Sequence, residues 1–168
     1  MFFCGLRSRE TINLKVSDVN LTENYARILG KGDKERVVPS TDNLIKVILK
    51  YLRLERPKTD SQHLFLALKG PRRGSPLTSP AIRKIFLYHR KISGIYRANA
   101  HRFRHTFGAN MAKAGIPLVS LMKLMGHADI QTTMKYVNLS AEDVRDAFNN
   151  AIGKLNNQGL LDEQKNLF

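Results

Sequence analysis

The sequence predicts a mainly α-helical fold with one small antiparallel β-sheet, an α+β arrangement in a single domain. Two observations indicate this class. Apolar side chains recur at helical spacing along several segments, and two short segments of strand-like composition flank a tip of turn-forming residues. The chain has 168 residues, and a domain of this length can bury roughly 70 % of its unfolded surface, so a hydrophobic core is expected.

The predicted sheet lies near the start of the chain. Residues 10–14 have helical character, and residues 15–20 change toward strand composition. Residues 25–29 (YARIL) and 35–39 (ERVVP) are short β segments, and the glycines and aspartate between them favour a tight turn. The sequence therefore predicts a β-hairpin that presents Lys31 at its turn.

The middle of the chain contains two predicted helices. A serine or threonine at positions 40–41 caps the first helix, whose apolar stripe continues to about Leu54. Ser79 is the expected N-cap of the second helix, with Pro80 at its first helical position. Between the two helices, residues 64–66 are a candidate short strand.

Four helical segments are expected after residue 99. The first covers residues 100–114, and the second covers residues 118–125. Asp129 can cap a third helix that carries Tyr136, and residues 140–143 resemble a capping box that opens the last one. The apolar stripe of this last helix consists of Val144, Ala147, Phe148, Ala151 and Leu155.

The helix predicted for residues 100–114 has two chemically different faces. At 100° per residue, the core-type face consists of Phe103, Phe107, Met111 and Ala114. The opposite face consists of His101, Arg104, His105 and Gly108. This second face is cationic, can donate hydrogen bonds and has no side chain at the glycine. It therefore suits an anionic ligand.

The charge balance indicates nucleic acid as the leading partner. The chain has 28 Lys+Arg against 14 Asp+Glu, a formal net charge of +14, together with 42 % hydrophobic residues. This combination is typical of a folded basic domain and not of a disordered polycation. Basic residues gather in the hairpin, in the loop before the second helix and along that helix. The candidate DNA contacts among them are Lys34, Lys69, Arg72, Arg73, Arg83, Lys84 and Arg90.

The sequence also predicts the compartment. A single cysteine, Cys4, excludes an internal disulfide and fits a reducing cytoplasm. Apolar runs stay shorter than the ~18 residues that a membrane span needs, and the apolar start at residues 1–4 is too short for a signal peptide. We therefore expect a cytoplasmic protein with no membrane partner.

Simple explanations compete for each candidate residue taken alone. The i, i+4 pair His101 and His105 is half of a zinc site, but Arg104 would place a fixed positive charge beside the metal. The serines and Cys4 lack the context of a hydrolase nucleophile, and the glycines around Lys31 do not form a Walker loop. By itself, a tyrosine such as residue 136 belongs more often to a core than to a reaction. The combination of these residues changes that assessment.

The combination resembles the catalytic domain of tyrosine recombinases, the phage integrase family. Residues 5–10 (GLRSRE) are similar to the first arginine motif of the family, with its acidic residue three positions on. Residues 30–39 (GKGDKERVVP) resemble the β-hairpin lysine motif, and residues 101–107 (HRFRHTF) resemble the His-x-x-Arg-His box. Residues 124–127 (LMGH), followed by residues 132–136 (TTMKY), match the last histidine and the tyrosine nucleophile.

The resemblance extends from Cys4 to about Leu139 and includes five motifs in order. The family normally has a further N-terminal DNA-binding domain and a helix before the first arginine motif, and the sequence contains neither. We therefore expect a catalytic-domain fragment or the product of a truncated gene, with the DNA-cleaving and joining domain at residues 1–155. Residues 156–168 are expected to be a polar C-terminal tail.

The resemblance implies the central chemistry. Arg7 and Arg104 would bind the non-bridging oxygens of a phosphodiester, for which permanently charged five-donor forks are suited. Tyr136 would attack phosphorus, form a 3′-phosphotyrosyl bond and expel a 5′-hydroxyl. Lys31, on the hairpin, would protonate that leaving oxygen as general acid.

The remaining motif residues receive supporting roles from the same resemblance. His101 would be the general acid/base partner of Tyr136, and His127 a hydrogen-bond donor to the phosphate. Glu10 would orient the site, and His105 would buttress it. No metal, nucleotide or other cofactor is expected, because the energy of the broken bond is kept in the phosphotyrosine.

Three functions remain open from the sequence. The first is a site-specific DNA recombinase or integrase, acting on double-stranded DNA as a homo-oligomer, a tetramer on DNA, assembled through the C-terminal helix. The second is a catalytically silent, recombinase-derived DNA-binding regulator. The third is an enzyme of the type IB topoisomerase kind. A regulator would be expected to lack Tyr136 or one arginine, and both are present. The apolar stripe of the C-terminal helix fits a partner surface as well as packing within its own domain.

Overall fold

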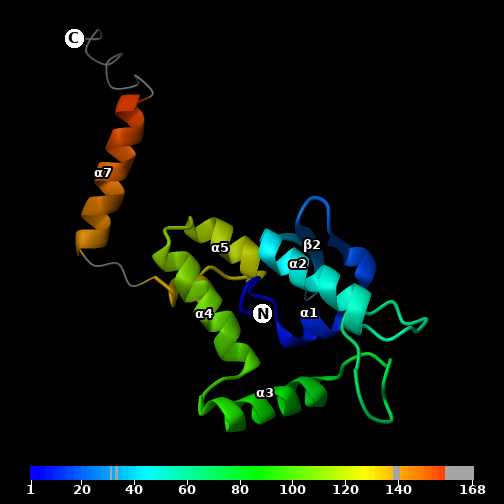
Figure 1. The fold of residues 1–168 in the computed structure, drawn as a ribbon. Helices are drawn as coiled ribbons and strands as arrows, with labels where there is room; N and C mark the ends of the chain where they lie inside the picture. Colours follow the sequence, from blue (N-terminus) through cyan, green and yellow to red (C-terminus); the bar gives the residue numbers. More distant parts are fainter. Residues whose placement is uncertain (31, 33, 138–140, 158–168) are drawn as a thin grey trace, which may run out of the picture. The chain divides into compact units, whose positions relative to one another are not determined.

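Helices dominate the computed structural model (Figure 1), which describes residues 1–30, 32, 34–137 and 141–157. Contacts divide the chain into two units, residues 1–136 and 137–168, and each is described here by itself. The first unit combines six α-helices with a three-stranded antiparallel sheet within its described residues. The predicted fold class, mainly α with a small antiparallel sheet, is confirmed.

The sheet has the order β1-β2-β3, with β1 at Val19–Asn20, β2 at Tyr25–Leu29 and β3 at Glu35–Pro39. The bounds of β2 and β3 agree with the two predicted strands. Their antiparallel register pairs Ala26 with Val38 and Ile28 with Arg36. One face of the sheet is buried, because Ala26, Ile28 and Val38 are each at most 7 % exposed.

Short helices flank this sheet. Helix α1 (Ser8–Asn13) and the 3₁₀ turn η1 (Val16–Asp18) precede it, while α2 (Asp42–Lys50) and the π-helical segment η2 (Tyr51–Glu55) follow it. Thr41 is the N-cap of α2, since its side chain accepts a hydrogen bond from the amide of Leu44. The first core joins the buried sheet face to apolar residues of the flanking segments, with Cys4, Leu6, Leu14 and Leu64 among its buried members.

Residues 64–66 do not form a regular strand. They are joined to the rest of the fold by isolated bridges, which pair Lys15 with His63 and Leu66 with Pro76. Leu64 and Leu66 are nevertheless buried, at 0 % and 2 % exposed. The apolar run therefore belongs to the core, and a strand was predicted because a short apolar run looks the same in both situations.

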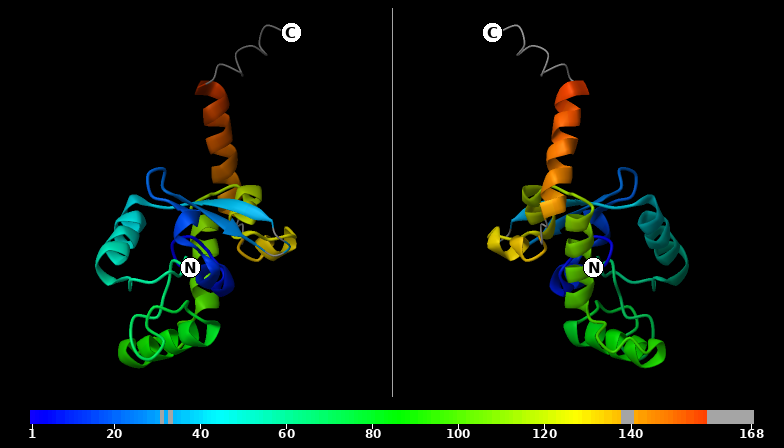
Figure 2. Two further views of the ribbon diagram at one scale, coloured as in Figure 1. Left: turned by 90° about the vertical axis from the view of Figure 1, so that its right-hand side faces the viewer. Right: turned by 90° about the vertical axis from the view of Figure 1, so that its left-hand side faces the viewer.

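Helix α3 (Ser79–Ser93) begins one residue earlier than predicted. Thr78 is its N-cap and accepts a hydrogen bond from the amide of Ala81, so Ser79 occupies the first helical position and Pro80 the second. Helix α4 (Ala100–Lys113) follows and runs from the end of α3 toward the rest of the fold. In Figure 2, α3 lies at the end of α4 that is remote from the sheet.

A second, smaller core packs against α4. It comes mainly from α5 (Leu118–Met125), whose Leu121 and Met125 are fully buried together with Phe107 of α4. Helix α5 ends at Gly126, which has a φ of 63° that favours glycine. Helix α6 (Gln131–Met134) is a single turn, so Tyr136 lies after it and not within a helix as predicted.

The second unit contains helix α7 (Ala141–Asn157). Two members of its predicted apolar stripe, Val144 and Phe148, are 56 % and 64 % exposed. The predicted capping residue Ser140 lies outside the described residues. Within the part of the chain that the structure describes, no helix combines the length and apolar character that crossing a membrane requires.

Candidate active site

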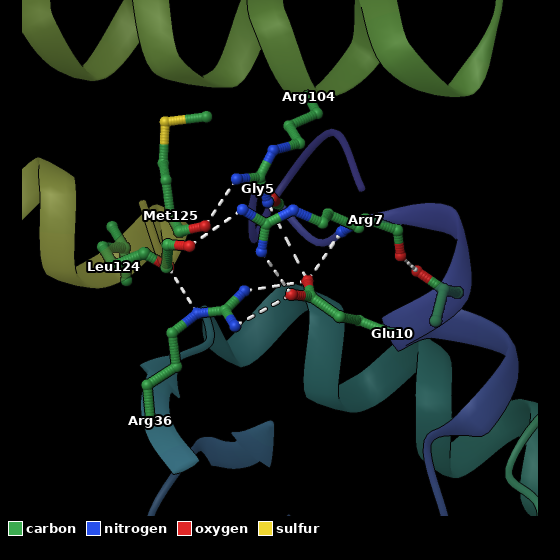
Figure 3. Close-up of polar contacts among 9 residues, drawn as sticks. Gly5, Arg7, Glu10, Arg36, Arg104, Leu124 and Met125 are labelled. Carbon is green, nitrogen blue, oxygen red and sulfur yellow. Dashed lines mark hydrogen bonds and ion pairs between the residues drawn. The ribbon is translucent and has the colours of Figure 1, made fainter. Parts of the chain in front are cut away.

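A buried carboxylate organises the arginines of this fold. Glu10 belongs to α1 and is 7 % exposed. Both of its oxygens accept two hydrogen bonds: Oε1 from the guanidinium groups of Arg7 and Arg36 at 2.8 and 2.9 Å, and Oε2 from the Arg7 amide at 2.7 Å and from Arg36 at 2.8 Å. Figure 3 shows the two guanidinium groups converging on this carboxylate. The bond from the Arg7 amide also caps α1.

The pKa of Glu10 follows from this arrangement. Burial raises the pKa, but the hydrogen bonds and charge of Arg36, together with the bonds from Arg7, outweigh burial and lower it to about 2. Glu10 is therefore ionised at neutral pH and balances part of the surrounding positive charge.

Main-chain carbonyls hold the guanidinium groups on their other sides. Arg104 of α4 donates to the carbonyls of Gly5 and Met125, and it lies 3.8 Å from Glu10. Arg7 donates to the Gly126 carbonyl at 2.8 Å. The N-terminal segment and the end of α5 thus fix two arginines that lie far apart in the sequence, as Figure 3 illustrates for Arg104 and Met125.

The face of α4 that the sequence assigned to an anionic ligand is only partly open. His101 and His105 are exposed, whereas Arg104 is 6 % exposed and Gly108 is buried. Met125 and Tyr136 approach this face at the glycine and cover it. Burial and the charge of Arg7 lower the pKa of Arg104 to about 10, which still leaves it protonated at neutral pH.

A cavity of about 370 Å³ opens beside the arginines. Positive or hydrogen-bonding side chains dominate its wall. It is lined by Arg7, Ser8, Ala100, His101, Arg104, His105, His127, Thr132, Lys135 and Tyr136. We call this cavity the cleft. Its surroundings favour an anionic ligand, and the tyrosine supplies a hydroxyl group in the same space.

Tyr136 reaches the cleft because Gly108 leaves room for it. A Cβ atom on Gly108 would lie 2.9 Å from Cζ of the tyrosine ring. The ring also meets His105 edge-on, with 5.0 Å between ring centroids, and lies parallel to His127 at 6.4 Å. Burial raises the pKa of Tyr136 and the charge of Arg104 opposes this, so the phenol is neutral at neutral pH.

His127 follows the end of α5 and is half-buried. Its Nδ1 lies 2.8 Å from Oγ1 of Thr133, a residue of α6 that is fully buried. Burial, followed by the charges of Arg104 and Arg7, lowers the pKa of His127 to about 4. The imidazole is therefore neutral at neutral pH and carries a single N–H.

Residues 1–143 match the family model described as the phage integrase family. The chain belongs to the phage integrase family. Tyrosine recombinase XerD of Staphylococcus aureus strain Mu50 is 33 % identical over 154 residues, which cover 89 % of this chain and 51 % of that protein. The XerD protein of Staphylococcus saprophyticus is 32 % identical over the same shares. The chain thus spans about half the length of these curated relatives.

Solved structures of two recombinases have a similar fold. The crystal structure of XerA recombinase matches with a TM-score of 0.73 and 30 % identity, covering 89 % of this chain and 54 % of that one. The XerH site-specific recombinase bound to difH substrate, in a pre-cleavage complex, matches with a TM-score of 0.71 and 28 % identity. That match covers 87 % of this chain and 43 % of XerH.

Most of the predicted site residues of this integrase-family chain lie together in the structure. Six of the predicted site residues line the cleft: Arg7, His101, Arg104, His105, His127 and Tyr136. Glu10 is the common ion-pair partner of two of them, Arg7 and Arg104. Lys31 lies outside the described residues. None of the candidate DNA contacts is among the residues that line the cleft. Arg90 is half-buried, and the others are exposed: Lys34, Lys69, Arg72, Arg73, Arg83 and Lys84.

Two residues of the site were given no role in the sequence-based prediction. Arg36 on β3 pairs with Glu10 and donates from Nε to the Leu124 carbonyl at 2.9 Å. Thr133 was noticed only as part of a motif. Alternation along β3 contained a signal for Arg36, because it shares the inward side with the fully buried Val38. A charged residue at an inward strand position indicates a buried partner.

Proposed function

We propose that this chain is the catalytic domain of a site-specific DNA recombinase, which cleaves and rejoins double-stranded DNA through a 3′-phosphotyrosyl intermediate. One observation carries the proposal: Arg7, Arg104 and Tyr136 line one cleft, although they come from three separate segments of the chain. Membership of the phage integrase family and the likeness to XerH, which was solved with a DNA substrate, support it.

The two arginines suit the phosphate. A phosphodiester is negatively charged, and a pentacovalent transition state spreads further charge over its non-bridging oxygens. Arg7 and Arg104 each use part of their donors on carbonyls or Glu10, which fixes their planes beside the cleft. Groups held in this way stabilise developing charge without reorganising, and losing one such donor costs roughly 10²–10³ in rate.

Tyr136 is the proposed nucleophile. Its phenol is neutral before reaction and must lose a proton as it attacks phosphorus. The neighbouring arginines favour the phenolate, and His101, which lines the same cleft, is the proposed acid/base partner. His105 contacts the tyrosine ring and is proposed to buttress it.

The leaving 5′-oxygen needs a proton, and Lys31 is the proposed donor. In the sequence it lies between β2 and β3, and β3 is tied to the site because Arg36 donates hydrogen bonds to Glu10 and to the Leu124 carbonyl of α5. Lys34 is the rival candidate on the same hairpin. The chemistry needs no ATP, since the phosphotyrosyl bond conserves the energy for religation.

The DNA surface, the domain extent and the assembly are parts of the same proposal. Residues 1–155 form the cleaving and joining domain, and residues 156–168 a tail. The basic loop and α3 supply phosphate contacts through Arg72, Arg83 and neighbouring cations. The exposed apolar residues Val144 and Phe148 on α7 support assembly with a second copy. The proposal also includes a cytoplasmic location, because the proposed substrate is DNA.

A nicked suicide DNA substrate tests the proposed function. The wild-type chain should form a covalent protein–DNA adduct that survives denaturing electrophoresis. Tyr136→Phe should abolish the adduct and leave DNA binding nearly unchanged, because one hydroxyl is lost and no charge. A wild-type chain that binds DNA without forming an adduct would favour the silent regulator. An adduct in the Tyr136→Phe variant would remove this tyrosine as nucleophile.

A further inference from the structure

The two ring nitrogens of His127 have different surroundings. Nδ1 lies 2.8 Å from the hydroxyl oxygen of Thr133. The ring itself is part of the cleft wall. With Nδ1 occupied by a threonine that is 0 % exposed, Nε2 is the ring nitrogen left to meet a ligand in the cleft.

The direction of this hydrogen bond decides where the imidazole carries its proton. A hydroxyl has one proton to donate, and a buried hydroxyl needs an acceptor for it. The amide of Thr133 already donates to the Ile130 carbonyl at 2.7 Å, and its carbonyl accepts from the Tyr136 amide at 3.0 Å. Among the described residues, Nδ1 of His127 is the acceptor that lies within reach of the buried hydroxyl.

The charge state of His127 decides how many of its ring nitrogens are protonated. Burial opposes a positive charge on this ring and lowers its pKa, and the charges of Arg104, Arg7, Lys135 and Arg36 lower the pKa further. The ring is therefore neutral, with one N–H. If Thr133 donates to Nδ1, that N–H is on Nε2.

We propose that Thr133 is a positioning residue: its hydroxyl donates to Nδ1 of His127 and fixes the tautomer that points an Nε2–H into the cleft. The ligand of that N–H is an anionic oxygen, and under the proposed function it is a phosphodiester oxygen of DNA. The opposite tautomer would present a lone pair to the same oxygen, which would repel it. The role of Thr133 in catalysis rests on the proposed function, but the tautomer does not.

The tautomer can be measured in the free protein by nitrogen-15 NMR of its imidazoles at neutral pH, with the His127 signals assigned by their loss in His127→Gln. The wild type should show a protonated Nε2 and an unprotonated Nδ1. Thr133→Ser keeps the hydroxyl and should preserve this pattern. Thr133→Val removes the hydroxyl at similar volume and should populate the other tautomer. The adjacent Thr132→Val should leave the pattern unchanged.

The wild-type spectrum alone can overturn the proposal, even if Thr133→Val does not fold: a proton on Nδ1 would mean that Thr133 accepts instead of donating. An unchanged pattern in a folded Thr133→Val variant would also overturn it. On the suicide DNA substrate, Thr133→Val should slow adduct formation roughly tenfold, the effect of one lost neutral hydrogen bond, and Thr133→Ser should restore the rate.

The two measurements separate the proposal from the proposed function. If Thr133→Val changes the tautomer but not the rate of adduct formation, the hydrogen bond from Thr133 to His127 is supported. His127 would then not be a hydrogen-bond donor to the phosphate. A wild-type chain without adduct would refute the proposed function, while the NMR pattern would still decide the role of Thr133.

Discussion

The two sides of the cleft are held in place by different interactions. Arg7, Arg104 and His127 form what we call the anchored side, because each donates or accepts hydrogen bonds with buried or main-chain partners. His101, His105 and Tyr136 form the packed side. There, the two histidines are exposed, and the tyrosine ring is located by its contacts with Gly108 and with neighbouring rings.

The difference indicates which substitutions each side will tolerate. On the anchored side, the donors are oriented before any substrate arrives, so a change of charge or hydrogen-bonding capacity removes that orientation. On the packed side, position depends on volume, so an added methyl group is the more damaging change. Both sides face one cleft, and the proposed reaction uses both. Three predictions test this comparison, in order of expected effect.

The largest effect concerns the proton for the leaving oxygen. If Lys31 donates it, Lys31→Ala should slow adduct formation by roughly 10²–10⁴ on normal DNA. A substrate with sulfur at the 5′-bridging position should largely restore the rate, because a thiolate leaves without a proton. Arg104→Ala should not be rescued, since its proposed role is charge stabilisation. Rates of adduct formation on the two substrates provide the measurement.

The same experiment locates the acid. Rescue of Lys34→Ala and not of Lys31→Ala would move the acid along the hairpin. Rescue of His101→Ala would place the general acid on the packed side, which would then supply both proton transfers.

Much of the fold could be predicted from local patterns. Strands β2 and β3 were located by their strand-like composition on either side of a glycine-rich turn, and α5 by its apolar periodicity and its end at Gly126. The sequence prediction placed Tyr136 in a helix that Asp129 would cap. Its amide instead bonds the Thr133 carbonyl just after a single helical turn. The end of so short a helix cannot be recognised from the amino-acid composition.

The sequence predicted which residues belong to the candidate site, but not which groups hold them in place. Arg7, Arg104 and Tyr136 belong to recognisable motifs. However, the partners that fix the arginines are carbonyls of Gly5, Met125 and other residues distant in sequence. A main-chain carbonyl has no side-chain signature, so only the fold could reveal these bonds.

The second prediction tests the anchored side through acid stability. The folded-state pKa of Glu10 is about 2, below its ordinary value of 4.5, so its contribution is present above pH 4.5 and is lost as pH falls toward 2. This contribution is about 3 kcal/mol. Glu10→Gln should lower the free energy of unfolding by about this amount at neutral pH. The difference from wild type should narrow as pH falls through that window, as urea denaturation at several pH values will show.

The control for Glu10 is an exposed carboxylate. Glu55→Gln should change the free energy of unfolding by no more than about 0.5 kcal/mol, as is usual for surface positions. A Glu10→Gln deficit that stays constant from neutral pH to pH 2 would mean that the lost contribution is not ionic.

The smallest of the three effects concerns the packed side. In Gly108→Ala, the new Cβ would lie 2.9 Å from Cζ of Tyr136 and 3.0 Å from Sδ of Met125. Met125 is fully buried and the tyrosine only half-buried, so the tyrosine ring has the greater freedom to move. A displacement of about 1 Å from the attacking position costs on the order of 10² in rate. Adduct formation should therefore slow by about this factor, while DNA affinity stays near wild type because the arginines are not displaced.

The matched control is Gly153→Ala on α7. A Cβ there meets nothing within 4 Å, and alanine favours a helix over glycine by about 1 kcal/mol, so this variant should be no less stable than wild type. Thermal unfolding of both variants separates misplacement of Tyr136 from a general loss of the fold. If a folded Gly108→Ala chain formed adduct at the wild-type rate, Tyr136 would have to attack from a position that Gly108 does not determine. The packed side would then tolerate added volume as well as an exposed surface position does.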